Sequence, residues 1–256
     1  MRTSDISLQL YTTRNFQPYE KILQFVSKIG ITNIELFGLE NINTEEFKKF
    51  KEDFQISFKS SHFSFEALKD TSSIIAKAKD LNVKHLIVPA PPIKGNSFKD
   101  QFSMNENEWI SFGKELSSYI TVFTNEGLTL GYHNHSFEFI PLESQKLPIE
   151  CVLDQNENLK FEIDIGWAIA GGADPKKWIE RYSEKIIACH LKDFFDSENN
   201  MLDHENQTSV GNGFINWKDI ISNMHKTNCE LFILEHDDPK DYKNYITDSM
   251  NNLLKI

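Results

Sequence analysis

The stretch GYHNHSFEF, at 131–139, places two histidines and a glutamate directly after the strand-like run LTL. Alternate side chains of a β-strand point to opposite faces, so His133 and His135 are expected to point the same way. An imidazole nitrogen can bind a divalent metal ion or accept a proton near neutral pH. The stretch therefore indicates one part of a site that holds a metal ion and moves protons.

Three later β-rich runs end in side chains of the same kind: FEIDIGW, IIACHLKDF and ELFILEHDD. Strand alternation puts Glu162 and Asp164 on one face of the first run. It puts His190 and Lys192 on one face of the second run and Glu235 on one face of the third. A buried charge is costly unless it is paired or ligated, so a cluster of these residues predicts a bound cation or substrate.

Short β-rich runs alternate with longer amphipathic stretches along all 256 residues. The predicted strands lie at 6–11, 33–38, 56–65, 85–92, 128–135, 159–167, 186–194 and 230–238. The predicted helices lie between and after them, at 18–30, 43–54, 71–82, 105–127, around 148–155, and at 174–185, 215–228 and 238–256. Eight strand–helix units of this length predict an α/β fold, a closed (β/α)8 TIM barrel formed by residues 1–256 as a single domain.

An open doubly wound sheet is the rival architecture, but no GxGxxG follows the first predicted strand. The polar stretch 195–213 follows the seventh predicted strand, and we expect it to form a lid or rim of the site. Active sites of TIM barrels lie at the carboxyl ends of the strands, where the polar residues collect.

One residue from each of the last four strands makes up the predicted metal site: His133, Asp164, His190 and Glu235. Glu138 competes for the first place, since a turn after the strand could fold it back. Carboxylates and imidazoles suit Mn²⁺ as the first expectation, with Zn²⁺, Co²⁺ or Mg²⁺ as alternatives. The remaining histidines are not expected to bind the ion: His85, at the other end of a strand, His236, with the wrong parity, and His204 and His225, at the surface.

The composition restricts the classes of partner. The formal net charge is −11, which disfavours nucleic acid because phosphates need a basic face. No apolar run approaches the ~20 residues of a membrane span, and no basic-then-apolar leader follows Met1. Cys151, Cys189 and Cys229 are scattered, as expected of reduced thiols in a cytoplasmic protein. The oligomeric state is left open, a homo-oligomer included.

Seven pieces of the chain resemble, in order, the xylose isomerase-like (AP endonuclease family 2) barrels, which include sugar phosphate isomerases/epimerases. The pieces are SLQLYTTRN, NIELFG, GYHNHSFEF, EIDIGWAIAGGADP, CHLKDF, VGNGFINW and ILEHDDP. In the tagatose epimerase and hydroxypyruvate isomerase relatives, Glu, Asp, His and Glu at four successive strand ends hold one divalent metal ion. Asp164, His190 and Glu235 match the last three by position.

The first glutamate of that pattern is absent here, where the chain reads YHNH. This departure resembles the inosose dehydratase, 3-keto-glycoside lyase and C-glycoside deglycosidase branch. The resemblance to dehydroshikimate dehydratases implies a catalytic role for His135, two residues after the first ligand. Trp167 stands where the family often has a histidine, and we expect it to wall the sugar pocket.

The resemblance implies a metal-dependent isomerase or epimerase that abstracts a proton beside the carbonyl of a sugar or keto-sugar. We assign His135 as the base, Glu138 or Lys192 as the partner acid, and Glu35 and His62 as residues that hold substrate hydroxyls. Lys192 could instead bind a phosphate or carboxylate, or form a salt bridge with Asp193. A lyase or dehydratase acting on a keto-sugar or 3-keto-glycoside is the close alternative. An AP endonuclease and a non-catalytic sugar-binding barrel are remote ones.

Overall fold

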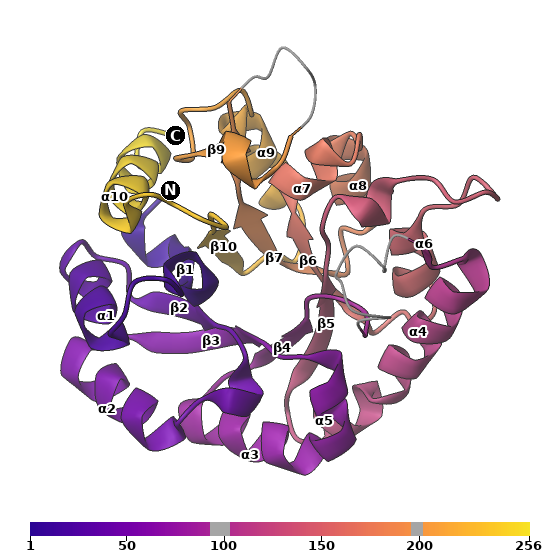
Figure 1. The fold of residues 1–256 in the computed structure, drawn as a ribbon, viewed down its shortest axis with the longest axis horizontal. Helices are drawn as coiled ribbons and strands as arrows, with labels where there is room; N and C mark the ends of the chain where they lie inside the picture. The colour runs from indigo at the N-terminus through magenta and orange to yellow at the C-terminus, as the bar shows by residue number, and fades with distance from the viewer. Residues whose placement is uncertain (93–102, 196–201) are drawn as a thin grey trace.

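Eight short parallel strands close into a barrel within residues 1–92, 103–195 and 202–256, which this computed structural model describes. The order around the barrel is β1-β10-β7-β6-β5-β4-β3-β2, and Figure 1 shows it with the helices outside. The strands are β1 (Ile6–Gln9), β2 (Asn33–Leu36), β3 (Ser57–His62), β4 (His85–Val88), β5 (Thr129–His133), β6 (Lys160–Asp164), β7 (Ile186–Leu191) and β10 (Leu231–Leu234). The predicted TIM barrel is confirmed, and its organisation as a single domain stays a prediction.

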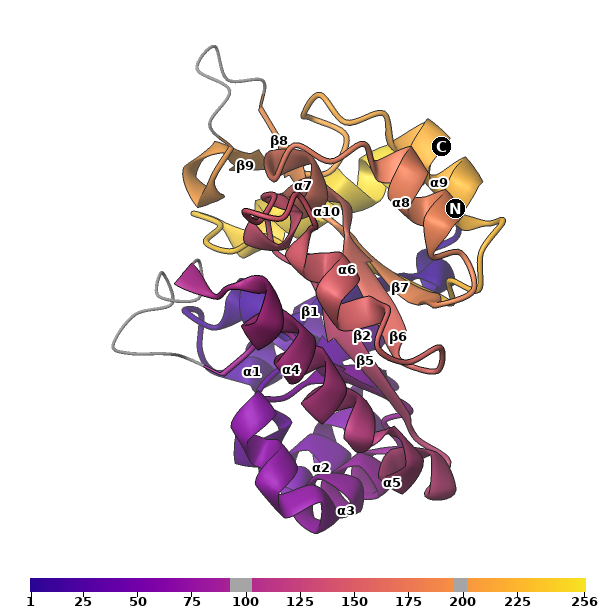
Figure 2. The same cartoon turned by 90° about the vertical axis from the view of Figure 1, so that its right-hand side faces the viewer.

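Amphipathic helices cover the outer surface of the barrel. They are α1 (Tyr19–Lys28), α2 (Thr44–Phe54), α3 (Thr71–Leu81), α4 (Glu106–Ser118), α5 (Ile120–Asn125), α6 (Pro148–Leu153), α7 (Ile165–Ala170), α8 (Pro175–Arg181), α9 (Trp217–Met224) and α10 (Tyr242–Leu253). Figure 2 shows the barrel from the side, with α4 and α6 toward the viewer. The predicted helix at 105–127 is two helices, since Tyr119 separates α4 from α5. Among the described residues, no helix is both long and apolar enough to cross a bilayer.

Side-chain polarity divides the barrel into an outer and an inner environment. Outward residues such as Leu8, Tyr132 and Ile163 are buried against the helices in one large apolar core. A small separate cluster contains Ile87, Ile187, Ala188, Leu231 and Ile233. Above it, toward the carboxyl ends of the strands, the inner positions are polar. The barrel therefore packs by its outer layer and its base, which leaves the upper interior for chemistry.

Asp164 sets the point where β6 ends. Its Oδ1 atom accepts a hydrogen bond from the Trp167 backbone N–H at 2.8 Å, as the N-cap of α7. Gly166 lets this helix lie against the end of β7, because a Cβ atom there would come within 2.4 Å of the Lys192 carbonyl oxygen. The predicted strand at 159–167 is therefore shorter, and the Asp164 carboxylate is held at a fixed position.

A small hairpin occupies part of the stretch that we expected to be a lid or rim. β8 (Asp193–Phe194) pairs antiparallel with β9 (Gln207–Thr208), while 196–201 lies outside the described residues. The buried Asp193 carboxylate accepts hydrogen bonds from Gly211 N at 2.8 Å, Gly213 N at 3.2 Å and the Trp217 indole N–H at 2.8 Å. Asp193 therefore ties the hairpin to the start of α9.

We predict that Asp193→Ala lowers the free energy of unfolding by about 3 kcal/mol, because several N–H groups lose a charged acceptor. Urea unfolding followed by circular dichroism measures the change. The matched control is Asp248→Ala, which truncates an exposed residue of α10 and is expected to change stability by less than about 0.5 kcal/mol. Equal stability of the two variants would contradict the role given to Asp193.

Candidate metal centre and substrate cavity

The four residues of the predicted metal site come together at the carboxyl end of the barrel. His133 ends β5, Asp164 ends β6, His190 lies one residue before the end of β7, and Glu235 directly follows β10. One ligand atom from each of the four lies within 4.8 Å of those of the others, and all four side chains are buried. Strand alternation brings them inward, and the parallel register sets them at a similar height.

Glu162 connects three histidines one layer deeper in the barrel. Its Oε1 atom lies 2.5 Å from His62 Nε2, 3.1 Å from His133 Nδ1 and 3.1 Å from His190 Nε2. One ligand atom from each of these four residues also lies within 4.8 Å of those of the others. Strand alternation predicted that Glu162 points inward but gave it no role, because alternation does not reveal contacts across the barrel.

His190 uses its two ring nitrogens in opposite directions. Nε2 lies 2.7 Å from Glu35 Oε2 in the lower layer, and Nδ1 lies 3.0 Å from Glu235 Oε2 in the upper group. When Nε2 carries a proton toward the lower carboxylates, Nδ1 keeps its lone pair for a metal ion. Carboxylates that accept the second N–H of a histidine ligand in this way fix its orientation and raise its basicity.

The donor set of the upper group fits a divalent ion of the Mn²⁺ or Zn²⁺ type. It offers two imidazoles and two carboxylates, and it has no thiolate. Asp164 Oδ2 is buried and accepts no hydrogen bond from the described residues. The cation next to it is the Lys192 ammonium, whose Nζ lies 3.2 Å from Asp164 Oδ2 and 2.9 Å from Glu235 Oε2. The structure thus contains a buried His/Asp/Glu group that could hold a metal ion.

Burial and neighbouring cations act in opposite directions on the pKa values of the carboxylates around His190. Burial raises the pKa of Asp164 to about 6, although Lys192 opposes the shift. Burial also contributes most to raising the pKa of Glu35 to about 7. Burial would raise the pKa of Glu235 as well, but Lys192 and His190 outweigh it and hold this pKa well below its ordinary value. A bound cation would favour the ionised form of all three carboxylates.

A cavity of about 680 Å³ opens directly above the upper group. Five of the residues predicted from the sequence line it: His62, His133, His135, Trp167 and Glu235. The cavity is bounded mostly by loops that follow the strands, as is usual for TIM barrels. Its volume is typical of a site for a small ligand.

The other predicted residues lie behind the cavity wall. Glu35 lies below His190, where Gln9 Nε2 donates to it at 2.8 Å, so it is placed to support His190 rather than to meet a substrate hydroxyl. Glu138 accepts hydrogen bonds from the Tyr132 hydroxyl at 2.7 Å and the His135 backbone N–H at 2.8 Å. It is not in either group of potential ligands found among the described residues.

Several residues that line the cavity were not assigned to the site from the sequence. They include Arg14, Glu40, Asp237 and Asp238, all of which lie beyond the carboxyl ends of the strands that precede them. His204, expected at the surface, is exposed and also lines the cavity. The available signal for Asp237 was its parity, which it shares with Glu235 in the predicted strand at 230–238.

The match to known families agrees with this geometry. The family described as "Xylose isomerase-like TIM barrel" matches residues 17–256. The chain belongs to this family. None of the curated proteins compared with the chain matches it.

Solved structures of similar fold have low sequence identity to this family member. A sugar phosphate isomerase/epimerase from Parabacteroides distasonis ATCC 8503 is 21% identical, with a TM-score of 0.79 over 99% of this chain and 94% of its own. The probable 3-DHS dehydratase AsbF from Bacillus anthracis is 16% identical, with a TM-score of 0.74 over 98% of both chains. IolI, solved with a bound zinc atom, is 15% identical, with a TM-score of 0.71 over 98% and 97%. At these identities the likeness establishes the fold alone.

We predict that Glu162→Gln weakens the binding of Mn²⁺ and Zn²⁺ about 10- to 100-fold, as loss of a carboxylate behind histidine ligands does. The neutral amide accepts imidazole N–H groups less strongly, so His133 and His190 lose their fixed orientation. Calorimetric titration of the metal-free protein measures the affinity. Glu230→Gln is the matched control, because Glu230 is exposed and pairs with Lys84 away from the site. Equal affinities of the two variants would contradict the role of Glu162.

Proposed function

We propose that the protein is a divalent-metal-dependent sugar isomerase or epimerase that removes a proton from the carbon beside a carbonyl group. The observation that supports this is the convergence of His133, Asp164, His190 and Glu235 beneath a cavity of small-ligand size. These four residues would hold a divalent ion, with Mn²⁺ as the first expectation, which would supply Lewis-acid stabilisation of the negative charge that develops on substrate oxygens.

His135 is the proposed base. It lines the cavity two residues beyond His133, and the ring centroids of the two histidines are 5.2 Å apart. Burial, assisted by the charge of Lys192, lowers the pKa of His135 to about 4, so the imidazole is neutral near pH 7 and can accept a proton. The hydrogen bond from its backbone N–H to Glu138 positions the loop that carries it.

Lys192 and Trp167 are proposed to complete the reacting environment. Lys192 Nζ lies 4.7 Å from the centroid of the Trp167 ring and bridges Asp164, Glu235 and Asp237. The ammonium group lies behind the cavity lining, next to Trp167 and Glu235, from where it could donate a hydrogen bond or a proton to a reacting group. The buried Trp167 Nε1 atom has no hydrogen-bond acceptor among the described residues, so it could donate to a substrate hydroxyl.

A lyase or dehydratase is the second candidate, because the same proton abstraction followed by loss of a β-oxygen gives elimination. The HNH sequence at 133–135 favours it, and AsbF, a structural neighbour, is described as a probable dehydratase. An AP endonuclease is disfavoured by the net charge of −11, which repels DNA. A small-molecule substrate and a cytoplasmic location belong to the same proposal.

We predict that exhaustive chelation abolishes turnover and that added Mn²⁺ restores it. The protein is incubated in D₂O with D-fructose and, separately, with methyl 3-keto-β-glucoside, and products are followed by NMR. An epimer or aldose supports an isomerase or epimerase, whereas release of methanol supports the lyase. Full turnover after chelation would contradict both metal-dependent candidates.

We predict that His135→Gln slows deuterium uptake at the carbon beside the carbonyl by about 10²- to 10⁴-fold, the usual contribution of a general base. Mn²⁺ affinity, measured by calorimetry, should stay within about threefold, since His135 is not among the proposed ligands. His225→Gln, which alters an exposed histidine outside the cavity, is the matched control. Unchanged deuterium uptake in His135→Gln would remove this residue as the base.

A further inference from the structure

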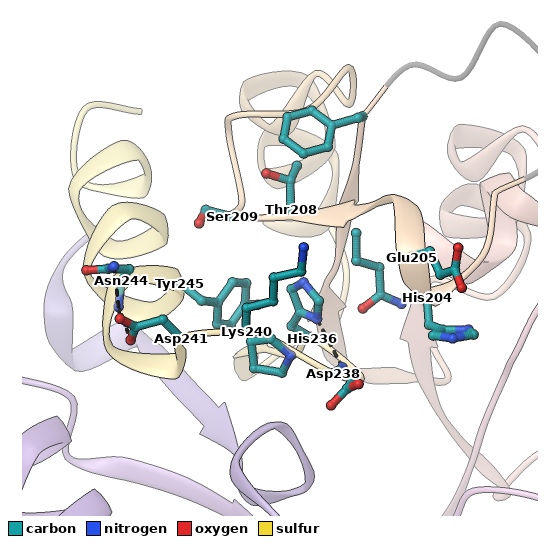
Figure 3. Close-up of a pocket in the computed structure, with 13 residues that line it drawn as sticks. His204, Glu205, Thr208, Ser209, His236, Asp238, Lys240, Asp241, Asn244 and Tyr245 are labelled. Atoms are coloured by element: carbon teal, nitrogen blue, oxygen red, sulfur yellow. Dashed lines mark hydrogen bonds between the residues drawn. The ribbon is translucent and has the colours of Figure 1, made fainter. Parts of the chain in front are cut away.

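A second cavity of about 740 Å³ lies beside the first at the same end of the barrel. It is bordered by the β8–β9 hairpin, the loop after β10 and the first turn of α10. Figure 3 shows Thr208 and Ser209 on the hairpin side, with His236 on the loop after β10 and Tyr245 on α10. Its volume falls within the range of small-molecule sites.

The two cavities meet at shared residues. His204 and Asp238 line both of them, so a ligand above the metal centre could extend past these side chains into the second cavity. Asp237 lies at the same boundary, where its backbone N–H donates to Gln207 Oε1 at 2.7 Å and its carboxylate pairs with Lys192 at 3.2 Å. These contacts connect the wall of the second cavity to the Lys192 ammonium group, which lies beside Asp164.

The charges that line the second cavity do not suit an anion. Glu205, Asp238 and Asp241 contribute negative charge, and Lys240 is the single Lys or Arg in the described lining. Phosphate sites instead gather cations or several free backbone N–H groups. Asp241 is the N-cap of α10, where its Oδ1 atom accepts hydrogen bonds from the backbone N–H groups of Lys243 and Asn244. These two N–H groups are therefore already paired and do not form an anion site.

Neutral donors and acceptors dominate the rest of the lining. His236 Nδ1 accepts the Asp238 N–H at 3.1 Å, so a neutral His236 carries its proton on Nε2. The Tyr245 hydroxyl is buried and has no hydrogen-bond partner among the described residues. Phe195 is 55% exposed and offers an apolar ring at the rim. Hydroxyl groups, an imidazole N–H and an aromatic face together match an uncharged sugar ring, which has both polar edges and apolar C–H faces.

We propose that this cavity is a second substrate subsite, which binds the uncharged sugar ring attached to the unit that reacts above the metal centre. The inference rests on the proposed function and narrows its substrate class to two-ring glycosides. Interactions with a part of the substrate remote from the reacting carbon can orient that carbon for proton transfer.

Calorimetry of the Mn²⁺-loaded protein tests the subsite with a set of related ligands. D-fructose offers one ring; turanose, maltulose and isomaltulose each add a neutral glucosyl ring at a different position; and D-fructose 6-phosphate adds an anion. We expect at least one disaccharide to bind about tenfold more tightly than D-fructose, a gain of the size that one or two hydrogen bonds provide. D-fructose 6-phosphate should bind no more tightly than D-fructose.

Two variants test whether the tighter binding of a disaccharide comes from the second cavity. Ser209→Trp, at a half-buried residue that lines only the second cavity, should remove the disaccharide's advantage and leave D-fructose binding within about twofold. Tyr245→Phe, which removes only the buried hydroxyl, should weaken the disaccharide about fivefold. Ser222→Trp, on the exposed face of α9, is the matched control and should leave the affinity for both sugars unchanged.

Different failures have different meanings. Mn²⁺-dependent binding of D-fructose with no gain for any disaccharide, or a gain for the phosphate alone, would overturn the subsite and leave the proposed function standing. An equal loss of affinity for D-fructose and for the disaccharide in Tyr245→Phe would also overturn the subsite. If no sugar binds in an Mn²⁺-dependent way, the proposed function fails and the subsite fails with it.

Discussion

The burial of several carboxylates at one end of the barrel is the constraint on which the rest of this structure depends. Glu35, Glu162 and Asp164 have no exposed surface and Glu235 is 5% exposed, whereas Lys192 is the one buried Lys or Arg among the described residues. Isolated buried charges cost several kcal/mol each unless they are paired and hydrogen-bonded. Histidine N–H groups, Lys192 and, we propose, a divalent cation stabilise the buried carboxylates in this chain.

This electrostatic arrangement explains why the barrel has two layers of histidine contacts. The lower carboxylates, Glu35 and Glu162, face the Nε2 atom of His190, and Glu235 faces its Nδ1 atom. A ring held from one side by acceptors is pre-oriented for a ligand on the other side, so the ion need not order it on binding. His62 contributes to the lower layer through Glu162 and also reaches the cavity, which links the two levels.

Strand alternation predicted which side chains of each strand point inward, because it is a local property of the strand. The predicted inward set of His133, Asp164, His190 and Glu235 does converge, even though the four residues span 103 positions. Depth was not predictable in the same way. Glu35 shares the inward parity, yet it lies below His190, since height in the barrel depends on the register between neighbouring strands rather than on sequence spacing.

Residues in loops were harder to place for a different reason. Glu138 follows β5 in a short 3₁₀ turn, Phe137–Phe139, and its contacts depend on the Tyr132 hydroxyl, which points out of the same strand. His204 and Asp238 come from two separate loops that meet only in the folded chain. The hydrophobic periodicity of the sequence does not predict contacts between distant loops. The residues that line both cavities were therefore found only from the structure.

The proposed metal site and the second cavity lie on parts of the fold with different constraints. The proposed ligands lie on or directly beside strands, where a shift of one residue would turn them out of the interior. The second cavity is bounded by the hairpin and the loop after β10, which can change without disturbing the barrel. Proton abstraction at a metal centre leads to epimerisation, isomerisation or elimination depending on what leaves and where the proton returns. His204 and Asp238 line both cavities, and Asp237 lines the first and is hydrogen-bonded to Gln207 of the second. In the proposed reaction, these boundary groups are therefore placed to influence which of the three outcomes follows.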